Sequence, residues 1–125
     1  MGREKTIAVQ MDEILDHVKN TVDEDIEKSS DAAAKVARSN LKENSPKDKG
    51  DYAKGWRIKK DKKAKTTIVH NSKYPGLTHL LENGHIVKNA KGIVGRAAGV
   101  KHIEPAAEEG AAEFVESAEK GLNRL

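Results

Sequence analysis

The feature that most constrains this chain is a run of apolar and small residues at helical spacing through its first third. Steps of three and four residues place such side chains on one face of a helix, and no Gly or Pro interrupts residues 3–45. The sequence therefore predicts one long amphipathic helix over residues 1–44. Its apolar face comprises Met11, Ile14, Leu15, Val18, Val22, Ile26, Ala33, Val36, Ala37 and Leu41.

The length of this helix raises a question about packing. A straight helix over residues 11–43 would span about 50 Å at roughly 1.5 Å per residue, more than a globule of this size can cover. Either the helix bends near residues 29–31, where two serines and an aspartate could cap a new start, or its first half projects to bind something else. Surface charges such as Asp12, Asp16 and Lys19 are typical of a solvated helix face.

A turn and a hairpin are expected next. Pro46 disfavours helix at the residue before it, and Gly50 permits a positive-φ turn. Alternation around Trp56 and the β-branched residues at 66–71 predict an antiparallel hairpin over residues 52–71. Its tip carries Lys59, Lys60, Lys62, Lys63 and Lys65. Such lysines protect a sheet edge or, less often, contact phosphate.

The last third predicts two helices with a glycine-rich segment between them. Residues 76–84 form a short helix that places Leu80 and Leu81 on one face and closes at Gly84. Residues 85–104 are expected to be a mobile Gly-rich loop or a hairpin. Pro105 is typical of the first turn of a helix, here one that runs over residues 105–125.

These elements predict a single α+β domain over residues 1–125. We expect a long N-terminal helix, a small antiparallel sheet with a short helix, and a C-terminal helix packed on the sheet. The core must be thin, because the chain has only four aromatic residues and alanine supplies many of its hydrophobic positions. A subunit that gains burial from its neighbours fits this composition.

Composition also narrows the function classes. The chain has no Cys, which excludes disulfides, thiolate nucleophiles and Cys-based zinc sites. No apolar stretch is long enough for a signal peptide or a membrane span, so a cytosolic protein without membrane contact is expected. The charge is segregated: residues 1–41 and 104–125 are acidic, and residues 42–73 and 85–103 are basic. That pattern suits like subunits packing together or a basic middle that meets nucleic acid.

The strongest case for an active site is a polar set that could gather around a metal. It consists of Glu82, His79, His85 and His102. The spacing argues against a metal site, because His85 lies beyond the helix-ending Gly84 and no HExxH pattern occurs. We expect histidines that cap, hydrogen-bond or line a subunit contact, and no catalytic, cofactor-binding or metal site.

Other chemistries find less support in the sequence. No G-x-S-x-G pattern is present, and the glycines at 92, 95 and 99 form neither a Walker A loop nor a dinucleotide fingerprint. The basic middle lacks interleaved aromatic residues and a known nucleic-acid motif. Non-specific contact with a nucleic-acid backbone stays open.

The order of several short motifs resembles the phage tail-component family. The motifs are Ser45-Pro46-x-Asp48-x-Gly50-Asp51-Tyr52, then Trp56, then Tyr74-x-x-Leu77-Thr78-His79-Leu80-Leu81-Glu82-Asn83-Gly84-His85, then His102-Ile103-Glu104-Pro105-Ala106. The family comprises head–tail connector, neck and tail-completion proteins of long-tailed phages and prophages. The likeness covers roughly residues 30–120. Lys49 and Tyr52 depart from the usual Thr and Leu, but Gly50 keeps the turn intact.

The resemblance implies a non-enzymatic structural subunit without a cofactor, which assembles as a homo-oligomeric ring with neighbouring neck or tail proteins. Such a subunit would pass from the host cytoplasm into the virion and could contact packaged DNA. The alternatives are a basic protein bound non-specifically to the DNA backbone and a small metal-dependent hydrolase. For the assembly function the residues of interest are structural: Gly50, Leu80, Leu81 and Phe114.

Overall fold

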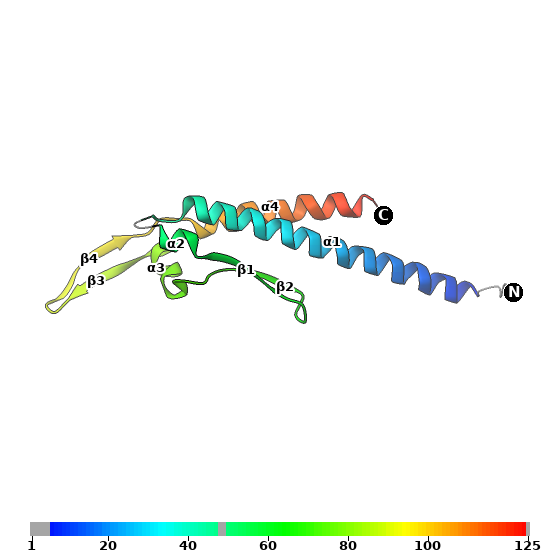
Figure 1. Ribbon diagram of the computed structural model, residues 1–125, viewed down its shortest axis with the longest axis horizontal. Coiled ribbons are helices and arrows are strands. Elements are labelled where there is room, and N and C mark those ends of the chain that lie inside the picture. Colours follow the sequence, from blue (N-terminus) through cyan, green and yellow to red (C-terminus); the bar gives the residue numbers. More distant parts are fainter. Residues whose placement is uncertain (1–5, 48–49, 125) are drawn as a thin grey trace.

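One helix dominates the structure. The computed structural model describes residues 6–47 and 50–124, and α1 (Ile7–Asn44) is an unbroken helix of 38 residues. Thr6 caps its start, since Oγ1 accepts a hydrogen bond from the backbone N–H of Val9 at 3.2 Å. The helix ends before Pro46, as the restriction on the residue preceding proline predicts. No bend occurs at residues 29–31, and the first half of α1 projects beyond the rest of the chain (Figure 1).

A short helix and a hairpin follow. Gly50 has φ of 84°, the positive-φ turn expected there, and it leads into α2 (Asp51–Lys54). The predicted hairpin over 52–71 is therefore shorter, comprising β1 (Trp56–Asp61) and β2 (Thr66–Asn71). The two strands pair antiparallel from Trp56 opposite Asn71 to Asp61 opposite Thr66.

The glycine-rich segment is a second hairpin. After η1 (Pro75–Leu77) and α3 (Thr78–Asn83), β3 (Gly84–Asn89) pairs antiparallel with β4 (Gly92–Ala98). The mobile loop expected over 85–104 is wrong for most of that range, and the alternative of a hairpin is confirmed. Gly84 and Gly99 permit a close approach of two backbones, since a Cβ on Gly99 would lie 2.4 Å from the carbonyl oxygen of Glu82.

The last helix packs in a different place from the one predicted. α4 (Ile103–Leu122) begins two residues before Pro105 and runs along α1 rather than on a sheet (Figure 1). Ile103 and Ala106, in its first turn, share the core with Val69 of β2. Small residues permit this close packing. A Cβ on Gly110 would lie 3.2 Å from the carbonyl oxygen of Ala33, and Ser29 donates a hydrogen bond to Ser117 at 3.0 Å.

The core is small, and it lies where α1, α2, β1 and α4 meet. Its buried residues are Leu41, Tyr52, Trp56 and Ala106, against which Val69, Leu81 and Ile103 pack. Leu81, Leu80 and Phe114 are all half-buried, and Leu81 packs against the core cluster. The predicted α+β class is confirmed. The outer half of α1 and the β3–β4 hairpin extend from this core in opposite directions (Figure 1).

Candidate functional site

The structure separates the four polar residues that the sequence suggested as a metal set. Glu82 and His102 lie together in the interior, but His79 is exposed on α3 and His85 lies half-buried on β3. Within residues 6–47 and 50–124, no cluster of three or more His, Asp or Glu side chains is arranged to hold a metal ion. Glu82 and His102 instead belong to a buried network of hydrogen bonds, which we call the junction and which links α3 to the start of α4.

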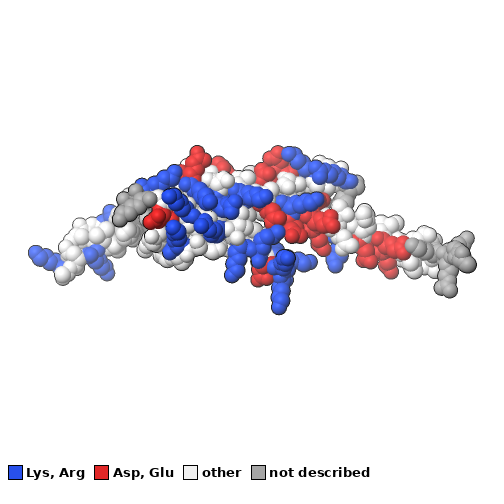
Figure 2. All heavy atoms as spheres, viewed as in Figure 1, with Lys and Arg blue, Asp and Glu red and all other residues white. Residues whose placement is uncertain are grey.

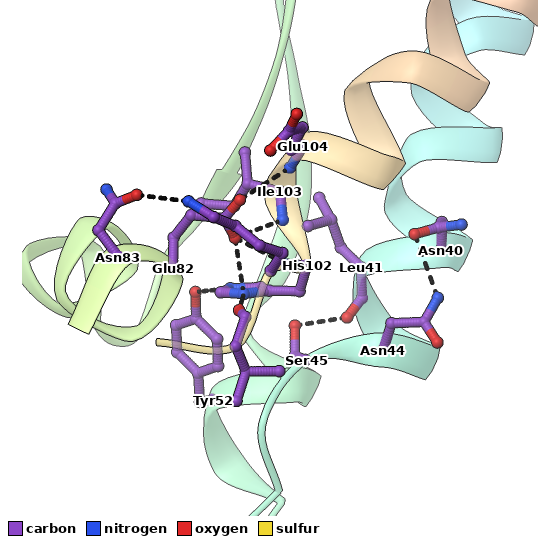
Figure 3. Close-up of polar contacts among 12 residues, drawn as sticks. Asn40, Leu41, Asn44, Ser45, Tyr52, Glu82, Asn83, His102, Ile103 and Glu104 are labelled. Carbon is purple, nitrogen blue, oxygen red and sulfur yellow. Dashed lines mark hydrogen bonds and ion pairs between the residues drawn. The ribbon is translucent and has the colours of Figure 1, made fainter. Parts of the chain in front are cut away.

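Glu82 caps the start of α4 from a distant part of the chain. Its carboxylate accepts hydrogen bonds from the backbone N–H groups of His102 at 2.7 Å, Ile103 at 2.8 Å and Glu104 at 3.0 Å (Figure 3). Burial acts to raise the pKa of Glu82, but these three N–H donors, aided by His102, outweigh it and lower that pKa. The carboxylate is thus charged at neutral pH and satisfies the first N–H groups of the helix.

His102 is fully buried, and both of its ring nitrogens are engaged. Nδ1 lies 2.7 Å from the carbonyl oxygen of Val100 and 3.0 Å from Oε1 of Glu82, while Nε2 lies 2.8 Å from the hydroxyl of Tyr52. Both neighbours of Nδ1 accept hydrogen bonds, so Nδ1 carries a proton, and in the neutral imidazole Nε2 accepts a hydrogen bond from the Tyr52 hydroxyl. Burial, followed by the charge of Glu82, raises the pKa of Tyr52 to about 12.

Two polar side chains that sequence reasoning missed complete this junction. Asn71 donates to the carbonyl oxygen of Tyr52 at 2.7 Å and accepts from the N–H groups of Lys73 and Tyr74. Ser45 accepts from the indole N–H of Trp56 at 2.8 Å and donates to the carbonyl oxygen of Leu41. An Asn at the end of a strand, before a Pro-containing turn, was the available signal for the first of them. The junction binds α1, α2, β2 and α4 together, and its donors and acceptors are used internally.

The surfaces that remain open lie outside this junction. A row of large apolar side chains is exposed on the projecting half of α1, with Ile14 at 62% and Leu15 at 61% of full exposure. We call this row the α1 stripe; it comprises Ile7, Met11, Ile14, Leu15 and Val18. Ile86, Val87, Ile93 and Val94 are exposed on the β3–β4 hairpin. Exposed apolar surface of this extent is typical of a protein that binds other proteins.

The charges also favour contacts between molecules. On the face in Figure 2, Asp and Glu gather on the outer part of α1, and Lys and Arg gather on the β1–β2 tip and on the projecting β3–β4 hairpin. Lys60 is already paired, because it donates to Glu27 at 3.3 Å and to Asp31 at 3.1 Å, which raises its pKa. An open groove of about 700 Å³ lies between α1 and the β1–β2 tip, lined by carboxylates on one side and lysines on the other.

None of the helices in the described part of the chain has the length and apolar character needed to cross a bilayer.

Comparison with known proteins gives one match. The model of the HK97-gp10-like family, described as "Bacteriophage HK97-gp10, putative tail-component", matches residues 9–84, more than half of the chain. No curated protein and no solved structure matches the chain significantly. The matched range runs from the first turn of α1 to the first residue of β3. The resemblance seen in the sequence is thereby confirmed, and the chain belongs to the HK97-gp10-like family of phage tail components, structural proteins of the virion that interact with other phage structural proteins.

Proposed function

We propose that this chain is a non-enzymatic subunit of the head–tail junction or tail of a phage or prophage, acting in assembly as a connector or tail-completion protein. It assembles in the host cytoplasm as a homo-oligomeric ring and contacts neighbouring neck or tail proteins. The chain acts as one domain, without a catalytic, cofactor-binding or metal site. The single observation that carries the proposal is family membership.

The distribution of burial supports an assembly role. Among the described residues, six hydrophobic ones are buried, three of them alanines, whereas seventeen large hydrophobic ones are exposed. A monomer with this balance gains stability when neighbours cover the exposed residues. The polar junction of Glu82, His102 and Tyr52 uses its hydrogen-bonding groups internally, as a structural element does.

Electron microscopy of particles made without this protein tests the proposal. Separate heads and tails are expected, and supplying the intact chain in trans should restore joined particles. Joined, normal particles in the absence of the protein would contradict a role at the junction.

A second candidate function is non-specific binding to the DNA backbone, favoured by the lysines of the β1–β2 tip. Lys59, Lys62, Lys63 and Lys65 are exposed there. Retention of the isolated protein on duplex DNA that falls steeply with added salt would support this function, because each phosphate contact releases counterions. Retention that is weak even at low salt would leave assembly as the function.

A further inference from the structure

The α1 stripe continues a face of α1 that α4 covers further along. On the covered part, Asp25 lies against Gly121, Ser29 bonds Ser117, and Ala33 lies against Gly110. Steps of three and four residues back from Asp25 lead through Val22 to the stripe. α4 ends at Leu122, close to Asp25. The same face is therefore packed from Asp25 onward and bare from Val18 to the start of the helix.

The β3–β4 hairpin offers a second bare surface, and its register defines it. Ile86 pairs with Arg96, and Lys88 pairs with Ile93. Paired residues point to the same side of a sheet, and side chains two apart on a strand share that side. These four side chains thus form one face, which we call the hairpin face. Its isoleucines are 51% and 67% exposed.

We propose that the α1 stripe of one copy docks on the hairpin face of a second copy. The two surfaces extend from opposite ends of the elongated molecule (Figure 1), so they do not meet within one chain. A contact between different surfaces of like subunits is heterologous, and repetition of it closes a ring or extends a filament. The inference rests on the proposed assembly function for its biological setting and on the two surfaces for its geometry.

Charge selects this pairing over the simplest alternative, in which two α1 stripes pair around a two-fold axis. Residues 7–18, which carry the α1 stripe, include Asp12, Glu13 and Asp16 and no Lys or Arg, whereas residues 84–98 carry Lys88, Lys91 and Arg96 and no carboxylate. Within the described residues, none of these three cations pairs with a carboxylate of its own chain. Two stripes together would bring like charges close, but a stripe on the hairpin face brings opposite charges close.

Disulfide trapping in the full-length chain tests the pairing, because the natural sequence has no cysteine. Leu15→Cys and Ile93→Cys variants, one carrying a tag, are mixed and mildly oxidised at the highest soluble concentration. The mixed disulfide is expected in excess over either homodimer. Lys62→Cys, on the tip of the other hairpin, is the matched control and should trap Leu15→Cys far less. A dominant Leu15→Cys homodimer, equal trapping by Lys62→Cys, or no trapping at all would overturn the proposal.

Charge reversal gives an independent readout. Lys88→Glu with Arg96→Glu should weaken self-association at low salt at least about tenfold, and Asp12→Lys with Asp16→Lys should restore part of it. Lys62→Glu with Lys63→Glu changes the net charge equally and should leave self-association unchanged; an equal loss in this control would overturn the pairing. Failure of both tests while particles without the protein still separate into heads and tails would reject the contact and keep the proposed function.

Discussion

Glu82 connects two parts of the chain that lie 20 residues apart. It is 7% exposed, and its carboxylate accepts three backbone N–H groups at the start of α4. Removing a buried acceptor that satisfies several donors destabilises a protein mainly because those donors are left unpaired. Its charge also suits the positive end of the helix dipole. Glu82 therefore helps to fix the start of α4 relative to α3.

Replacing Glu82 with Gln should destabilise the fold by about 1–3 kcal/mol at pH 7, because the amide has one acceptor oxygen and an NH2 group that faces other donors. The measurement is urea unfolding followed by circular dichroism. Glu108→Gln is the control, since Glu108 is exposed in the same helix and its replacement should cost less than about 0.5 kcal/mol. Equal costs for the two variants would mean that the cap contributes nothing specific.

The pH dependence of the same variant follows from the lowered pKa of Glu82. Since that pKa is lower in the folded than in the unfolded state, the stabilisation is complete above the unfolded value of about 4.3 and disappears as pH falls through the folded value. The difference in unfolding free energy between wild type and Glu82→Gln should therefore shrink as pH falls below about 4.3. A difference that stays constant down to the acid transition would contradict the ionised cap.

Tyr52→Phe removes the hydroxyl that donates to Nε2 of His102, leaving a buried acceptor unpaired at a cost of about 1–3 kcal/mol. Because the pKa of Tyr52 rises to about 12, its contribution to stability is complete below the ordinary value of about 10 and is lost as pH rises toward 12. Ultraviolet absorbance should show one tyrosine ionising near 12 in wild type and none there in Tyr52→Phe. Ionisation of both tyrosines near 10 would contradict the buried hydrogen bond.

At the scale of elements, the pairing of α1 with α4 depends on small residues. Gly110 lies in a tight contact, because a Cβ there would lie 3.2 Å from the backbone of Ala33 and 3.3 Å from the Cβ of Ala37. Gly110→Leu should cost about 2–3 kcal/mol by forcing the helices apart. Ala112→Leu, at an exposed position of the same helix, should be nearly neutral in thermal unfolding. Similar losses of stability in Gly110→Leu and Ala112→Leu would show that α1 and α4 can move apart to accept the larger side chain.

The two halves of α1 should also differ in their dynamics. Residues 25–41 pack against α4 and the core, whereas Met11, Ile14, Leu15 and Val18 are exposed, and a helix is marginal without packing. Hydrogen exchange of the monomer should therefore be fast at 10–18 and slow at 29–41. Assembly should slow exchange in the first range. Uniform protection along α1 in the monomer would contradict the predicted difference in dynamics between the two halves of the helix.

The elements that the sequence predicted well are those with local signals. Helical spacing predicted α1, and alternation with β-branched residues predicted the β1–β2 hairpin. The β3–β4 hairpin was harder, because Gly99 suggested a flexible segment, where the fold uses it with Gly84 for a close approach of two backbones. The packing of α4 against α1 was not predicted, because an apolar stripe indicates that one face of a helix is buried but not which element covers it. The sequence singled out Glu82 and His102 as polar residues that could gather, and hydrogen-bonded histidines were expected. The cap on α4 could not be predicted, since only the fold brings backbone N–H groups to the carboxylate of Glu82.

At the scale of the whole molecule, the exposed α1 stripe and hairpin face predict that the stability of the protein depends on its concentration. Subunit contacts form only between folded chains, so mass action should raise the apparent melting temperature as concentration rises. Ile14→Ser with Leu15→Ser should abolish this rise. Since both side chains are more than 60% exposed, the variant should match wild type at the lowest concentration, where neither assembles. Differential scanning fluorimetry over a dilution series, at low salt, measures both effects. A melting temperature that is independent of concentration in wild type would mean that the exposed ends meet only other proteins of the particle, because a chain that does not bind itself gains nothing from its own abundance.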